Sequence, residues 1–122
     1  MDGTVVEPQR FLPMADELGL GLVLGMQVIR QALEALIIWR HEGVDIDQVW
    51  VNLVPSQLDD PDFAHEVAAQ LAIRGLAPTC LVLEISAGQM DASEQRRSTL
   101  SLLRSLGIAV ALDDFGGAGT SL

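Results

Sequence analysis

Three apolar segments rich in β-branched residues recur at intervals of roughly 30 residues along the 122-residue chain, and they limit the folds open to it. The segments are VWVNLV (49–54), CLVLEIS (80–86) and IAVALDD (108–114). An interval of about 30 residues is the length of a strand–helix–strand unit. Because the segments are apolar on both faces, they predict parallel strands covered by helices. The expected class is therefore α/β, as an open sheet or an arc of a barrel.

Amphipathic patterns predict helices between and before these strands. Ser93 is a suitable N-cap for the last helix, and Gly107 is suited to the position just after its end. We also expect a short strand near Thr4. The predicted helices cover residues 8–18, 22–42, 62–73 and 93–106. The order of the main elements is thus α-α-β-α-β-α-β, and Arg96 and Arg97 are expected on the surface of the last helix.

Composition and charge exclude several classes of protein. Acidic residues outnumber basic ones by 17 to 7, giving a formal net charge of −10, which argues against binding to a nucleic-acid polymer. No apolar run reaches the ~18 residues of a membrane span, and no signal-peptide pattern is present. The chain has one cysteine, Cys80, which cannot form an internal disulfide. A cytoplasmic location is the expectation from this cysteine content.

Each predicted strand carries a polar residue near its carboxyl end: Asn52 in the first, Glu84 in the second, and Asp113 and Asp114 in the third. Ligands of parallel α/β folds bind at this end of the sheet. The two-residue period of a strand places Asn52, Glu84 and Asp113 on equivalent faces, so these three side chains converge if the faces align. Their oxygen atoms suit Mg²⁺, Mn²⁺ or Ca²⁺, and adjacent acids can bind two ions of a metal pair.

Each of these residues also has a structural interpretation. Asp113 and Asp114 precede a glycine-rich loop, and aspartate is common in turns. Asn52 alone fits a polar group with its hydrogen bonds satisfied, and Glu84 alone fits a surface acid on an edge strand. The convergence of three strand ends favours a site, but spacing does not identify a substrate.

Several motifs in order resemble the EAL-domain phosphodiesterases, which act on the bacterial second messenger cyclic di-GMP. The motifs are V-x-V-N-L followed by Q-L, then L-E-I, then A-L-D-D-F-G with a glycine-rich loop. An upstream segment over residues 3–20 resembles the family pattern G-x-V-x-P-x-x-F-x-P-x-A-E-x-x-G-L. The resemblance covers essentially the whole chain.

The resemblance implies a TIM-like (β/α) barrel and a signalling hydrolase that converts cyclic di-GMP to linear pGpG. Asn52, Glu84, Asp113 and Asp114 match family metal ligands, and the two aspartates match the catalytic pair. The implied cofactor is Mg²⁺ or Mn²⁺, with Ca²⁺ as an inhibitory substitute. The family is typically dimeric.

The chain departs from the family pattern in ways that bear on activity. Residues 1–122 are expected to form one incomplete EAL-like domain, which lacks the first signature strand and the second half of the barrel. Glu34-Ala35-Leu36 spells the family name but lies in a predicted helix, where Glu34 is expected on a solvated face. The family has a loop-stabilising glutamate at the position of Ala87.

Three functions follow as hypotheses. The first is part of a phosphodiesterase domain that is inactive by itself, with weak or no binding of cyclic di-GMP. The second is a degenerate, non-catalytic module that binds cyclic di-GMP or a protein partner. The third is a structural fragment that only assembles. In each case the arc leaves strand edges and an apolar inner face uncovered, so we expect a dimer or higher oligomer, with a monomer of low stability as the alternative.

Overall fold

The computed structural model describes residues 9–11, 21–86, 93–113 and 119–121. They form one five-stranded sheet in the order β1-β2-β3-β4-β5. Neighbouring strands from β1 to β4 are parallel, and β5 is antiparallel to β4. The strands are β1 (Gln9–Phe11), β2 (Val49–Asn52), β3 (Leu81–Ser86), β4 (Ala109–Asp113) and β5 (Gly119–Ser121). The predicted α/β class and its parallel strands are confirmed.

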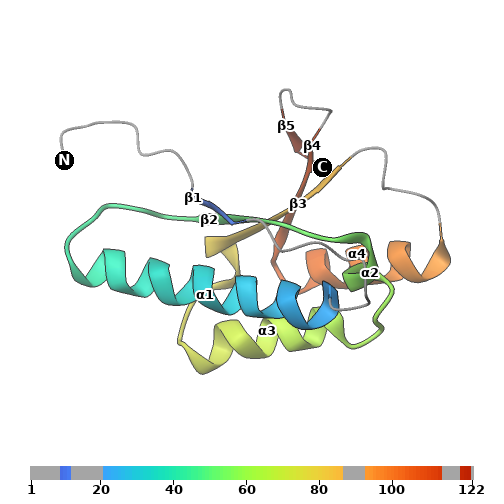
Figure 1. Cartoon of the computed structure of the whole chain (residues 1–122), viewed down its shortest axis with the longest axis horizontal. Coiled ribbons are helices and arrows are strands. Elements are labelled where there is room, and N and C mark those ends of the chain that lie inside the picture. The colour runs from blue at the N-terminus through green and yellow to red at the C-terminus, as the bar shows by residue number, and fades with distance from the viewer. Residues whose placement is uncertain (1–8, 12–20, 87–92, 114–118, 122) are drawn as a thin grey trace.

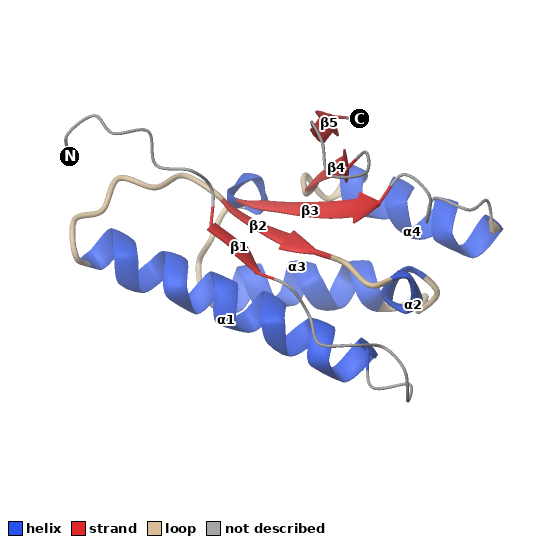
Figure 2. Ribbon diagram, turned by 45° about the horizontal axis from the view of Figure 1, so that its top comes forward, coloured by secondary structure: helices blue, strands red, loops and turns tan. Residues whose placement is uncertain are grey.

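Helices cover one face of this sheet (Figures 1 and 2). Helix α1 packs on β1 and β2, α3 packs against α1, and α4 packs on β4. The described helices are α1 (Gly21–His41), α2 (Pro55–Leu58), α3 (Phe63–Ile73) and α4 (Glu94–Ser105), with a 3₁₀ helix η1 (Pro78–Cys80). The four helices and the parallel strands therefore form an arc of a layered α/β structure.

The last helix has the ends that the sequence predicts. Ser93 Oγ accepts a hydrogen bond from the Arg96 amide at 3.1 Å, which satisfies a backbone donor in the first helical turn. Gly107 follows the helix with a φ of 90°, a left-handed conformation that suits glycine. Two further predictions, the helices over 22–42 and 62–73, are confirmed as α1 and α3 within one residue at each end.

The predicted helix over 8–18 is wrong at its beginning. Residues Gln9–Phe11 form strand β1, whose register with β2 pairs Gln9 with Val49 and Phe11 with Val51. The edge of β2 offers unpaired backbone groups, and pairing with them outweighs the local helical pattern, which Pro13 in its interior already weakens. Residues 12–18 and the strand expected near Thr4 lie outside the described residues.

The core lies between the sheet and its helical layer. Val49 and Val51 of β2 are buried on the helical side, whereas Trp50 and Asn52 on the opposite face are only half-buried. Among the described residues, the largest fully buried side chain is Phe63 of α3, and Leu33 and Leu36 of α1 are buried with it in the same cluster. This core fixes the positions of the strand ends.

Cys80 belongs to this core, because it is buried immediately before β3. Burial raises the pKa of its thiol, an effect that the positive charge of Arg40 offsets only in part. A raised pKa leaves less thiolate at a given pH, so we predict slow alkylation of native Cys80 by iodoacetamide at pH 8. Urea should restore the rate of an ordinary cysteine. Equal rates in native and unfolded chains would contradict the buried placement.

Candidate functional site

The candidate site lies at the carboxyl ends of β2, β3 and β4. Asn52 and Glu84 are register partners in the β2–β3 ladder, and the amide of Leu53 donates to the Glu84 carbonyl oxygen at 2.9 Å. In the β3–β4 ladder, Glu84 pairs with Ala111 and Ser86 pairs with Asp113. Asp113 thus lies two residues beyond the level of the pair formed by Asn52 and Glu84.

The structure brings two of the four predicted residues together with described side chains. Glu84 is 1% exposed, and Asn52 beside it is half-buried. The backbone of Asp113 belongs to β4, but its side chain and the whole of Asp114 lie outside what the structure describes. The alternative interpretation of Glu84 as a surface acid on an edge strand is wrong, because β3 is a central strand and the residue is buried.

A buried carboxylate at this position has a chemical consequence. Taking an ionised carboxylate out of water costs several kcal/mol unless hydrogen bonds or an opposite charge compensate it. A carboxylate and an amide oxygen at adjacent strand ends are hard oxygen donors of the kind that Mg²⁺, Mn²⁺ and Ca²⁺ prefer. The donor set of Asn52 and Glu84 therefore fits a divalent cation. Within the described side chains, no group of three His, Cys, Asp or Glu residues is arranged to hold a metal.

The segment after Asn52 is held by side-chain contacts that the sequence did not predict. Gln57 is buried, and its Oε1 accepts a hydrogen bond from the Val54 amide at 2.9 Å. Arg96 lies near the surface of the helix and forms an ion pair with Asp59 at 2.8 Å, and Arg97 is exposed as expected. The hydrogen bond from Arg96 holds the pKa of the Asp59 carboxyl below its usual value. Contacts between residues 37 apart carry no local sequence signal.

Glu34 has the role of a surface residue. It lies on an exposed face of α1, as predicted, and its Oε2 pairs with Arg74 Nε of α3 at 2.8 Å. This pair joins two helices on the side of the molecule that carries the helical layer. The segment Glu34-Ala35-Leu36 is therefore not part of the candidate site.

The face of the sheet that lies opposite the helical layer contains a hollow of about 360 Å³. Trp50, Val82, Ala109 and Ala111 line it from three neighbouring strands, and Arg104 of α4 also lines it. Trp50 Nε1 donates to Gln48 Oε1 at 3.3 Å, so the indole is tied to the start of its own strand. The hollow lies on the apolar inner face that the sequence predicted.

None of the described helices is both long enough and apolar enough to pass through a lipid bilayer.

Comparisons with known proteins identify the family. An uncharacterised signalling protein of Caulobacter vibrioides is 35% identical over 119 residues, covering 97% of this chain and 14% of that protein. The EAL domain of Mycobacterium smegmatis DcpA superposes with a TM-score of 0.71 at 30% identity, covering 88% of this chain and 49% of that one. The MucR phosphodiesterase, solved as a complex with cyclic di-GMP, gives a TM-score of 0.72 at 25% identity, covering 88% of this chain and 46% of that one.

The chain thus spans about half of the length of these two solved structures and a small part of the longer relative. The sequence model of the EAL domain matches residues 1–122. The arc of parallel strands and helices corresponds to part of the barrel in the EAL structures. The chain therefore belongs to the EAL domain family.

Proposed function

We propose that this chain supplies divalent-metal ligands to an EAL-type domain that hydrolyses cyclic di-GMP to linear pGpG, and that the chain alone does not turn over substrate. The observation that carries the proposal is the buried carboxylate of Glu84 in register with Asn52 at the carboxyl ends of parallel strands. Asp113 ends the neighbouring strand, and Asp114 follows it in the sequence. These four residues are the proposed ligands.

The residues would contribute in distinct ways. When bound, Mg²⁺ or Mn²⁺ ions activate water and neutralise charge on the phosphodiester. Glu84 supplies a carboxylate whose position is fixed by burial in a central strand. Asn52 supplies a neutral oxygen from the next strand, and the adjacent acids Asp113 and Asp114 allow each carboxylate to bind a different ion. Ca²⁺ fits the same oxygen ligands and would occupy the site without supporting hydrolysis.

The similarity to a phosphodiesterase solved with cyclic di-GMP supports this choice of substrate. The phosphates of such a ligand are negatively charged, whereas the chain carries a net charge of −10. Divalent cations between the two sets of charges remove this conflict. Binding of cyclic di-GMP is therefore expected to require them. A cytoplasmic location, inferred from the single unpaired cysteine, is part of the same proposal.

A second candidate is a non-catalytic module that binds cyclic di-GMP or a protein partner. The sequence Ser86-Ala87-Gly88 favours it, because the family usually has Thr-Glu-Ser after L-E-I and this chain lacks that glutamate. The two candidates share the ion site at the strand ends and differ in whether the site belongs to an active domain.

The fate of cyclic di-GMP tests the proposal. The purified chain is dialysed against cyclic di-GMP with Mn²⁺. The nucleotide on each side of the dialysis membrane is then identified by chromatography. We expect weak retention of unchanged cyclic di-GMP by the chain, reduced in an Asp113→Asn variant. Equal retention by the variant and the wild type would contradict the proposed site. Formation of pGpG that depends on Asp113 would contradict the expectation that the chain alone is inactive.

Self-association is the second consequence. In the hollow, Ala109 is exposed and Trp50 is half-buried, and β1 is the outermost of the described strands, so a second copy can cover surface at these places. We predict a dimer or higher oligomer in equilibrium sedimentation at micromolar concentration, weakened by Ala109→Glu in the hollow. A folded wild-type monomer under these conditions would contradict the prediction.

A further inference from the structure

The segment that follows Asn52 is tied directly to the strand that carries Glu84. The Leu53 amide donates to the Glu84 carbonyl oxygen at 2.9 Å. The chain then folds back on itself, because the Gln57 amide donates to the Val54 carbonyl oxygen at 3.0 Å while Gln57 Oε1 accepts from the Val54 amide. Any displacement of α2 is therefore transmitted to the segment next to Asn52.

Helix α1 supports one side of this reversal of the chain between Val54 and Gln57. A Cβ placed on Gly25 would clash with the side-chain amide of Gln57. Glycine at this position thus allows the buried Gln57 side chain to lie directly on the helix backbone. The support from α1 fixes the first half of the segment.

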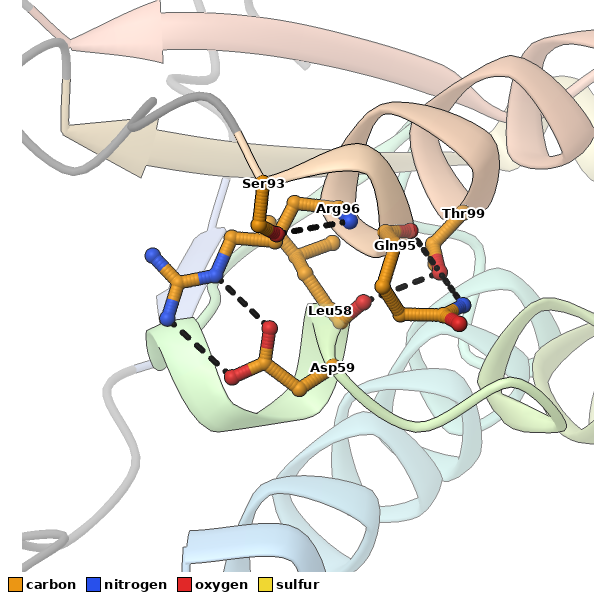
Figure 3. A network of polar contacts seen from close by, with 6 residues as sticks. All are labelled: Leu58, Asp59, Ser93, Gln95, Arg96 and Thr99. Carbon is orange, nitrogen blue, oxygen red and sulfur yellow. Dashed lines mark hydrogen bonds and ion pairs between the residues drawn. The ribbon is translucent and has the colours of Figure 1, made fainter.

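Helix α4 holds the other end of the segment through two contacts (Figure 3). Arg96 donates from Nε to Asp59 Oδ1 at 2.8 Å and from Nη2 to Asp59 Oδ2 at 3.1 Å, which makes a bidentate pair. The hydroxyl of the buried Thr99 lies 2.9 Å from the Leu58 carbonyl oxygen, as a donor to it. The guanidinium fork matches both carboxylate oxygens, so the pair fixes an orientation as well as a distance.

The ion pair between Arg96 and Asp59 bears on the candidate site because of where α4 lies in the chain. The helix lies between β3, which carries Glu84, and β4, which ends at Asp113. The contacts from α4 to Leu58 and Asp59 thus join the segment after Asn52 to the connection between the other two strands of the site. An ion pair this exposed, with side chains 22% and 49% accessible, contributes little to global stability.

We infer that Asp59 and Arg96 are positioning residues that hold the segment after Asn52 in the geometry needed for divalent-ion binding at the strand ends. The inference rests on the proposed function, because it concerns the same ion site. Neither residue is one of the proposed ligands. Their pair restricts the movement of α2 and, through Gln57 and Leu53, of the strand end that carries Asn52.

The test compares two variants of the full chain that each remove one positive charge. Arg96→Gln breaks the pair with Asp59, and Arg74→Gln breaks the pair with Glu34, which has the same 2.8 Å separation but joins α3 to α1. Hydrogen exchange without metal reports on the Leu53 and Gln57 amides, and calorimetry reports the affinity for Mn²⁺. The charge-matched control removes any general effect of net charge on cation binding.

We expect Arg96→Gln to accelerate exchange at Leu53 and Gln57 and to weaken Mn²⁺ affinity about tenfold, the lower end of the loss seen when a ligand-orienting contact is removed. Arg74→Gln should change neither. Slow exchange at Leu83 in β3 verifies that a variant is folded. If Arg96→Gln does not fold, the same two measurements are made on Arg96→Lys, because lysine keeps the charge but cannot form the bidentate pair.

Two failures are distinguishable. The positioning role would be overturned if the folded Arg96 variant matched the wild type either in hydrogen exchange at Leu53 and Gln57 or in affinity for Mn²⁺. A wild-type chain that binds no Mn²⁺ would contradict the proposed function itself, whatever Arg96 does to the exchange rates.

Discussion

Replacing Phe63 with alanine lowers the free energy of unfolding by about 3–5 kcal/mol. Phe63 is 1% exposed and is the largest fully buried side chain described, at the first position of α3. The substitution removes the transfer energy of the ring and leaves a cavity between the helical layer and the sheet. A typical domain is stable by only about 5–15 kcal/mol, so this loss is enough to unfold a large fraction of the chain. Urea denaturation followed by circular dichroism measures it.

Ile73 provides the control on the same helix. Its side chain is 75% exposed at the last position of α3, so Ile73→Ala should change stability by less than about 0.5 kcal/mol. Similar losses for Phe63→Ala and Ile73→Ala would contradict the placement of the core between α3 and the sheet.

Replacing Glu84 with glutamine removes most of the stabilisation that divalent ions give to the chain. An ion that binds only the folded state stabilises it by about 2.7 kcal/mol at one hundred times its dissociation constant. Glutamine keeps the shape of the buried side chain at position 84 but lacks the charge that favours the ion. Thermal unfolding with and without Mg²⁺ should therefore show a rise in midpoint for the wild type and almost none for Glu84→Gln.

Glu66→Gln is the matched control for this experiment. Glu66 lies exposed in the first turn of α3, and its replacement changes the net charge by the same amount. We expect the Mg²⁺-dependent rise in midpoint to persist in this variant. An equal rise in Glu84→Gln and in the wild type would exclude Glu84 as a ligand.

The sequence predicted the elements whose signals are local. The β-branched runs gave the parallel strands, and Ser93 and Gly107 marked the ends of α4, because caps depend on residues close in sequence. Strand β1 was missed because pairing with the edge of β2 decides it. Helix α2 was missed because its four residues are too few for a helical period to appear.

The candidate site was predictable to the extent that it depends on strand period. Alternation along the strands predicted that Asn52 and Glu84 lie on equivalent faces. The structure adds that the two residues are register partners. Arg96 and Asp59 were not predictable, since their contact depends on how α4 packs beside α2. The close approach of Gly25 to Gln57 likewise follows from the packing of α1 on α2. The predicted role of Asp114 lies outside the described residues and stays a prediction.

The most direct test of the central claim is a calorimetric titration of cyclic di-GMP into the chain with and without Ca²⁺, for the wild type and Asp113→Asn. Ca²⁺ should hold the nucleotide without hydrolysis, so the heat reports binding alone. The proposed ion site predicts weak binding that requires Ca²⁺ and is lost in Asp113→Asn. Binding that is independent of Ca²⁺, or equally strong in Asp113→Asn, would contradict it.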